Sequence, residues 1–196
     1  EWMAPIYRRT GGSGCPQCTN QTSKNELRIY TELATVFDDV QHRHKIDGVE
    51  IDVFLPEQKI GIEYDGKYWH GDKSNEDLEK GKHLEQLGIN LLRVRESPLP
   101  KIKDHDLIIP MGSFINKKTM DLIVNFIGDK SATDYLNKEE FIAEETYLTY
   151  LDYFPSPFPE HSLASVNPTL ATEWHPVKNS PLTPENFTPS AKPKVW

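Results

Sequence analysis

Four acidic residues occur in two alternating pairs that could hold a metal ion. Glu50 and Asp52 are separated by one residue, and so are Glu63 and Asp65. In an extended strand alternate side chains share a face, so each pair would point the same way. If the two segments pair across a turn at Pro56, Asp52 and Glu63 converge at one end of the sheet. Neighbouring carboxylates raise one another's pKa, and a divalent cation would remove that conflict.

The metal expected here is magnesium, because hard oxygen ligands suit this ion and it shares its coordination shell with substrate phosphates. Magnesium can lower the pKa of a bound water and stabilise charge on a phosphoryl oxygen. Lys67 or His70, which follow the second acidic pair, could accept the proton. The competing interpretation is that the acids line the solvated face of an antiparallel hairpin.

Periodicity and turn signals predict the elements that must position these residues. The segment from Ser23 to Glu26 is a capping box followed by apolar residues at helical spacing, so Glu26 has a structural explanation of its own. Gly88 is placed to end a second helix. The predicted elements are a helix from residue 24, strands over 49–55 and 60–65, a helix over 75–87, a strand over 89–94, and helices near 117–127 and 138–152.

The composition limits the class of protein. The 196 residues are 37% hydrophobic and 27% charged, which suits one medium-sized domain with appendages. The net charge of -8 argues against a surface that binds nucleic acid everywhere, although it permits a local basic strip. No apolar run approaches the length of a membrane-spanning helix. We therefore expect no membrane partner and an intracellular protein, either cytoplasmic or nucleoid-associated.

The two ends of the chain have their own signals. Cys15 and Cys18 form one CxxC pair, whereas tetrahedral zinc needs four ligands. The pair is therefore either half of a zinc site or two reduced cysteines in an ordinary loop. Nine of the 15 prolines lie in residues 155–196, which disfavours helices and central strands there.

The middle of the chain resembles the PD-(D/E)XK nuclease superfamily, in particular the branch of the very-short-patch-repair endonuclease. The resemblance covers residues 22–99 and is carried by IEYDGKYWH at 62–70 and GINLLRVRE at 88–96. It implies an α/β fold with a restriction-endonuclease-like αβββαβ core and a mixed sheet, followed by C-terminal helices.

The resemblance also implies a metal site. Asp52 takes the aspartate position of the first half-motif, although Ile51 stands where the family has proline. Glu63 takes the acidic position of the second half-motif, and the backbone carbonyl of Tyr64 completes the protein's ligands for Mg²⁺ or Mn²⁺. Glu26 corresponds to a helix acid that supports the site in many relatives.

The identity of the base depends on the register of the motif. Strict register places Asp65 at the family's lysine position, whereas a shifted register would use Lys67. His70 occupies the place of the base proposed in the repair branch, and we prefer it to Lys67. Tyr68 and Trp69 match aromatic residues that wedge into DNA, although they could equally be buried.

Three basic residues are candidates for contacts with the phosphate backbone of DNA. These are Lys80, Arg93 and Arg95. Such contacts would position a nuclease without reading sequence. For Lys80 the alternative is a solvated helix face.

The ends resemble halves of a zinc-ribbon repeat found in tandem arrays, so Cys15 and Cys18 would form an incomplete Zn²⁺ site within a longer array. The predicted divisions are a closing half-ribbon at 1–21, a nuclease-like domain at 22–130, a helical extension at 131–154, a proline-rich linker at 155–171 and an opening half-ribbon at 172–196.

The resulting hypothesis is a magnesium-dependent DNA endonuclease that nicks one strand per active site. Double-strand cleavage would need a homodimer or two events, and DNA repair, restriction or phage defence, and a mobile element are all open as pathways. RNA is an alternative substrate. The competing hypothesis is a catalytically inactive, nuclease-like module for DNA binding or assembly.

Overall fold

The computed structural model describes residues 22–67, 74–151, 162–180, 182–189 and 195. The chain divides into two compact units. One comprises Ser23–Tyr147, and the other comprises Glu1–Thr22 together with Leu148–Trp196. The first unit holds the sheet and most of the predicted site residues, so it is described first.

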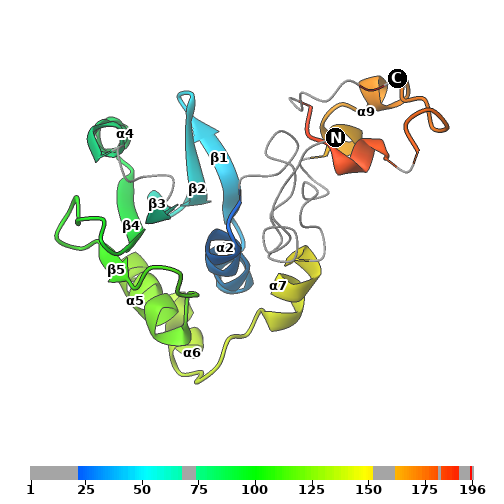
Figure 1. The fold of residues 1–196 in the computed structure, drawn as a ribbon. Helices are drawn as coiled ribbons and strands as arrows, with labels where there is room; N and C mark the ends of the chain where they lie inside the picture. The colour runs from blue at the N-terminus through cyan, green and yellow to red at the C-terminus, as the bar shows by residue number, and fades with distance from the viewer. Residues whose placement is uncertain (1–21, 68–73, 152–161, 181, 190–194, 196) are drawn as a thin grey trace. The chain divides into compact units, whose positions relative to one another are not determined.

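A five-stranded mixed sheet forms the centre of the first unit (Figure 1). Its order is β1-β2-β3-β4-β5, with antiparallel pairing between the first three strands and parallel pairing between the last three. The strands are β1 (Gln41–Ile46), β2 (Val49–Leu55), β3 (Ile60–Asp65), β4 (Asn90–Glu96) and β5 (Leu107–Ile109). The predicted α/β class and mixed sheet are confirmed, and β5 is an addition.

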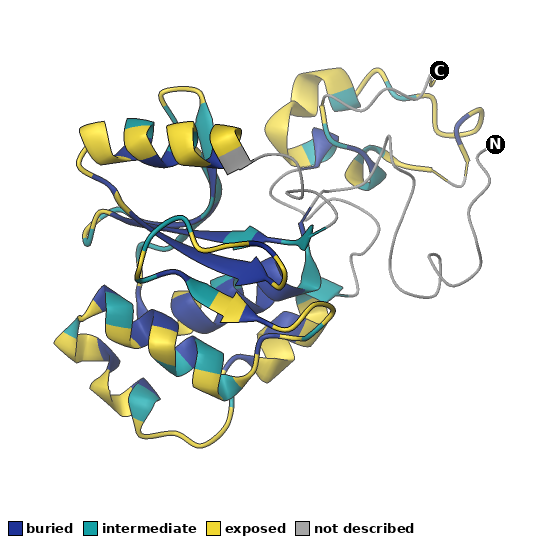
Figure 2. Cartoon of the chain, turned by 60° about the vertical axis from the view of Figure 1, so that its left-hand side comes forward, coloured by how far each residue is buried: buried dark blue, intermediate teal, exposed yellow. Residues whose placement is uncertain are grey.

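Helices cover both faces of this sheet. On one face, α2 (Lys24–Val36) and α5 (Lys117–Ile127) bury Ile29, Leu33 and Met120 against β2, β3 and β4. On the other face, α4 (Ser74–Gln86) contributes Leu84 to a smaller apolar cluster with Ile51 and Leu91. Figure 2 shows the buried strands between helices whose outer sides are exposed.

The local signals explain why these elements form. Ser23 and Glu26 make the predicted capping box at the start of α2. Asp47 and Gly48 both have positive φ in the two-residue turn between β1 and β2, the conformation that matches the twist of a hairpin. Gly88 also has positive φ, as expected for a residue that follows a helix.

One predicted helix is shorter than expected. Instead of spanning 138–152, α7 covers only Glu144–Leu151. The reason is that the preceding backbone is bonded to Glu32 of α2, whose carboxylate accepts hydrogen bonds from the N–H groups of Ile142 and Ala143. The short η1 (Lys130–Ala132) and α6 (Thr133–Leu136) lie between α5 and α7 in the chain.

The second unit contains short helices in its described part. These are α8 (Leu163–Val166), α9 (Pro168–Ala171) and η3 (Pro184–Asn186). The N–H of Leu163 donates to the carbonyl of Phe187 at 2.6 Å, and the ring of Phe187 contacts Trp174. Cys15 and Cys18 lie outside the described residues, so the zinc-ribbon hypothesis stays a prediction. None of the helices in the described ranges has the length and apolar character needed to cross a membrane.

Candidate active site where the sheet divides

The sheet divides into two arms beside the first acidic pair. β2 and β3 pair only over Val53–Leu55 and Ile60–Ile62. Beyond this short ladder β2 continues with β1, as far as the pair of Val49 with Ile46, and β3 continues with β4, as far as the pair of Asp65 with Arg95. We call the point of separation the fork. Figure 1 shows the β1–β2 hairpin extending upward from the fork, away from β3.

Asp52 and Glu63 meet at the fork. Continuing the ladder by one residue places them opposite each other. The N–H of Asp52 donates to Glu63 Oε1 at 3.3 Å, and the N–H of Tyr64 donates to Asp52 Oδ2 at 2.9 Å. Each carboxylate therefore accepts a backbone N–H from the neighbouring strand at the point where the regular ladder has ended. The structure brings these two predicted residues together.

The strand on the other side of Asp52 is distorted as well. β1 and β2 pair on both sides of Arg43, which has a φ of 50°. A non-glycine residue in this region is strained, and such residues cluster at functional sites. The Arg43 guanidinium binds Glu50 with a shortest distance of 2.6 Å. Glu50 is thus an ion-pair partner rather than a third acid at the fork.

Lys80 reaches the fork from α4. Its Nζ donates to Glu63 Oε2 at 2.6 Å, and its side chain is only 26% exposed. The alternative interpretation, in which Lys80 lies on a solvated helix face, is therefore wrong. In this structure the side chain points inward, where it supplies a positive charge beside two carboxylates.

The acids at the fork bind protons more tightly than exposed carboxylates do. Burial, reinforced by the charge of Glu26, raises the pKa of Asp52 from 3.8 to about 7. Burial, reinforced by Asp52, raises the pKa of Glu63 from 4.5 to about 7. Lys80 lowers both values but does not cancel the shift. An additional cation at the fork would favour the ionised carboxylates.

Glu26 and His42 form a buried pair beside the fork. Glu26 Oε2 accepts the N–H of Ser23, which leaves Oε1 to contact His42 Nε2 at 2.8 Å. The imidazole ring stacks on Tyr30 with centroids 4.8 Å apart. Burial raises the pKa of Glu26 to about 8. Glu26 therefore caps α2 and also lies close enough to Asp52 to affect its pKa.

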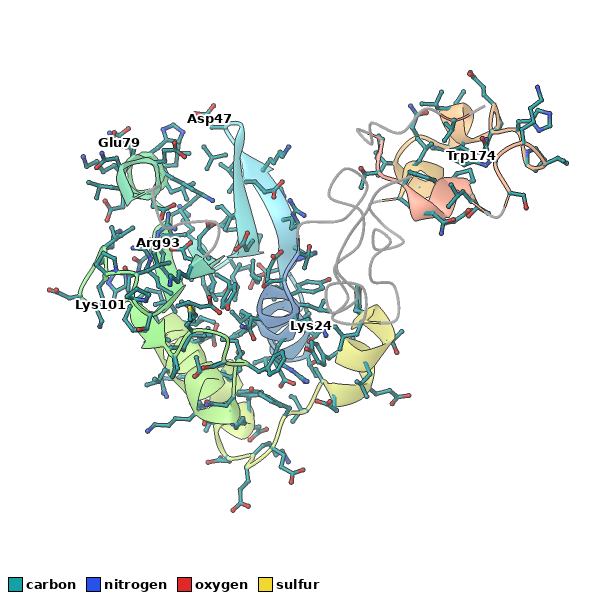
Figure 3. The ribbon with its side chains drawn as sticks, in the orientation of Figure 1. Lys24, Asp47, Glu79, Arg93, Lys101 and Trp174 are labelled. Atoms are coloured by element: carbon teal, nitrogen blue, oxygen red, sulfur yellow. The ribbon has the colours of Figure 1, made fainter. Side chains whose placement is uncertain are left out.

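A second cluster of charges lies under α4 and contains Asp65. Arg93 Nη1 is 3.0 Å from each Asp65 oxygen, and Arg95 Nε is 2.8 Å from Asp65 Oδ2. Arg95 also binds Asp77 Oδ2 at 2.8 Å, and the side chains of Asp65 and Arg95 are fully buried. Figure 3 labels Arg93 on β4, below α4.

This arrangement corrects three predictions. Arg93 and Arg95 are buried and hold internal carboxylates, so they are not positioned to contact DNA phosphates. Asp65, the residue at the family's lysine position, is held by two guanidinium groups and does not join Asp52 and Glu63 at the fork. Their alternation along β3 and β4 places all three on the face covered by α4.

The residues that follow β3 are partly described. Tyr64 Oη accepts a hydrogen bond from Asn25 at 2.7 Å and donates one to Glu96 at 2.8 Å. Burial raises the pKa of the Tyr64 hydroxyl. The N–H of Lys67 donates to Glu96 Oε2 at 3.1 Å. The other predicted residues of this segment, Tyr68, Trp69 and His70, lie outside the described residues.

The donor set at the fork is small. In the described part of the chain, no group of three or more histidine, cysteine, aspartate or glutamate side chains is arranged to hold a metal ion. The two carboxylates of Asp52 and Glu63 remain as side-chain donors, which fits an ion that keeps several waters, such as Mg²⁺, better than a metal held by protein ligands alone. The raised pKa values of both acids agree with such a fit.

No family model, curated protein or solved structure matches the chain significantly. His42 and the inward-facing Lys80 are the residues that the sequence did not place at this site.

Proposed function

We propose that residues 22–130 form a metal-dependent endonuclease that hydrolyses phosphodiester bonds in DNA. The observation that carries the proposal is the meeting of Asp52 and Glu63 at the fork, each with a pKa near 7. The element order α2-β1-β2-β3-α4-β4 also agrees with the αβββαβ core of the family that the sequence resembles.

In this proposal Asp52, Glu63 and the carbonyl of Tyr64 bind Mg²⁺ or Mn²⁺. When bound, the ion supplies a water of lowered pKa and positive charge beside the phosphoryl oxygens. Lys80 holds the Glu63 carboxylate and adds a positive charge next to the scissile phosphate. Glu26 and His42 hold a proton close to Asp52. His70, or alternatively Lys67, accepts the proton of the attacking water.

The test is a nicking assay with charge-neutral variants that keep their hydrogen bonds. In Asp52→Asn and Glu63→Gln an amide oxygen can still accept the backbone N–H that the carboxylate accepts. We expect the full chain to nick supercoiled plasmid with Mg²⁺ or Mn²⁺, and each variant to be slower by at least about a hundredfold, because the charges that bind the ion are reduced.

Asp47→Asn is the matched control, because Asp47 is an exposed acid in the turn between β1 and β2. It should cleave at the rate of the unmodified chain. Cleavage by Asp52→Asn at an unchanged rate would contradict the proposal. RNA is assayed in parallel, and the proposal predicts faster cleavage of DNA.

The second candidate is an inactive nuclease-like module that binds DNA or assembles with other chains. It is favoured by the engagement of Asp65 with Arg93 and Arg95, which leaves the family's lysine position without a base, and by the net charge of -8. This candidate is supported instead if the unmodified chain binds plasmid but cuts neither DNA nor RNA with either metal.

A further inference from the structure

The loop between β5 and α5 displays apolar side chains. This β5–α5 loop, residues 110–116, carries Phe114, which is 68% exposed, and Met111, which is 52% exposed. A single exposed apolar residue is common on protein surfaces. Here an aromatic ring and a methionine project from one short loop, and buried polar groups hold the backbone of this loop in place.

Buried polar groups fix the loop on both sides of Phe114. Asn25 Nδ2 donates to the carbonyl of Ser113, and Asn25 Oδ1 accepts the N–H of Ile115, both at 2.9 Å. Glu96 Oε1 accepts the N–H of Gly112 at 3.1 Å. Asn25 and Glu96 are 7% and 8% exposed. The exposure of Phe114 is thus set by an anchored backbone.

The same two anchors connect the loop to the fork. Asn25 and Glu96 bind the hydroxyl of Tyr64, and the backbone N–H of Tyr64 donates to Asp52. Glu96 also accepts the N–H of Lys67. Glu96 thus brings the backbone of Lys67 next to that of Gly112 in the loop, and in the described part of the chain Lys67 takes part in no ion pair.

We propose that Phe114 stacks on an unstacked base of a DNA strand whose phosphates lie near Lys67, with Met111 beside the same base. This inference rests on the proposed function, because it places the loop next to the strand that is cut. An aromatic face accepts every base, so the contact is independent of sequence. The positive charge of Lys67, whose backbone shares Glu96 with the loop, favours a strand that carries phosphates over an apolar protein partner.

Binding of DNA with a single-stranded gap tests the contact. The full chain carrying Asp52→Asn is titrated against labelled gapped DNA, so that no cleavage interferes. In this background we expect Phe114→Ala to weaken binding by about 5- to 150-fold, the range that corresponds to loss of one base–aromatic stack. Phe114→Trp should bind as the parent does. Phe114→Leu, which is apolar but not flat, should weaken binding as alanine does.

Leu122→Ala is the matched control, because Leu122 is an exposed apolar residue of α5 outside the loop. It should bind as the parent does. Equal binding by Phe114→Leu and the parent, or no DNA binding by the parent, overturns the inference. A loss of self-association in Phe114→Ala, measured by sedimentation, together with unchanged DNA binding, would assign the loop to a second copy instead.

Cleavage by the chain without Asp52→Asn separates the two proposals. If Phe114→Ala weakens DNA binding but no metal supports cleavage, the stacking contact stands and the endonuclease proposal fails. If cleavage occurs and Phe114→Ala changes neither KM nor binding, the endonuclease proposal stands and the stacking contact fails.

Discussion

The buried acids at the fork link folding to pH. Asp52 and Glu63 have folded-state pKa values of about 7, and Glu26 of about 8, compared with 3.8 to 4.5 for exposed groups. Between these limits the folded chain binds more protons than the unfolded chain does. These groups therefore add most to the free energy of unfolding below about pH 4. Their contribution decreases as the pH rises and is lost once the pH has passed 7 to 8.

We predict that, without metal, the Tm of the protein falls between pH 5 and pH 8. Mg²⁺ should raise the Tm more at pH 8 than at pH 5, because protons compete with the ion for Asp52 and Glu63. Thermal denaturation followed by circular dichroism measures both effects. The double variant Asp52→Asn, Glu63→Gln should show a weaker dependence on pH and no response to Mg²⁺. An equally steep fall in that variant would assign the effect to other groups.

Residue spacing predicted part of the site correctly. Alternation in β2 and β3, together with the pairing expected across the turn at Pro56, led us to expect Asp52 and Glu63 at one place. The inward position of Lys80 could also have been inferred from its spacing along the helix. Lys80 lies three residues after Asp77 and four before Leu84, both of which are buried, so the three share the inner face of α4. His42 depends on the pairing of β1, which residue types alone do not give.

At the scale of elements, α4 is held over the sheet by charges as well as by apolar contacts. Arg95 bridges Asp65 of β3 and Asp77 of α4, and it also donates to the carbonyl of Pro100 at 2.6 Å. A buried ion pair adds little net stability compared with apolar residues, but removing one partner leaves the other charge buried and uncompensated. The arginines of β4 are thus structural.

We predict that Arg95→Met lowers the free energy of unfolding by about 3–5 kcal/mol, because it leaves two aspartates short of a countercharge. Urea denaturation measures the change. Lys101→Met, at an exposed position of the loop that follows β4, should change stability by less than about 0.5 kcal/mol. A value for Arg95→Met as small as that of Lys101→Met would show that the network contributes nothing to folding.

The elements differed in how well they could be predicted. Helix α5 has the predicted bounds of 117–127, because an apolar stripe and a glycine end signal agree. β5 has only three residues and no alternation of its own, and it depends on pairing with β4. The predicted helix near 138–152 begins later than expected, because the backbone before α7 forms tertiary hydrogen bonds with Glu32 instead.

At the scale of the whole molecule, the segment after α6 completes the first unit. The Arg28 guanidinium carbon lies 4.4 Å from the centroid of the Phe141 ring and 3.5 Å from that of Tyr147. Glu144 binds the same guanidinium at 2.7 Å. Residues 138–147 therefore belong with the first unit, which extends to Tyr147.

We predict that a chain of residues 22–151 folds cooperatively, whereas a chain of residues 22–137 is less stable by about 2–4 kcal/mol. The shorter chain loses two cation–π contacts and two hydrogen bonds to Glu32, which carry most of this difference. Chemical denaturation of the two chains measures it. Equal stability would place 138–147 outside the folding unit.

The hydrogen bonds at the fork also bear on how this chain can change in evolution. Asp52 and Glu63 serve as acceptors for two backbone N–H groups that would otherwise lose their partners. Selection for folding alone would therefore retain an oxygen acceptor at each position, whether acid or amide. If the chain cleaves DNA as proposed, replacement by asparagine and glutamine, which keeps the acceptors and discards the charges, is the change expected in a lineage that no longer needs cleavage.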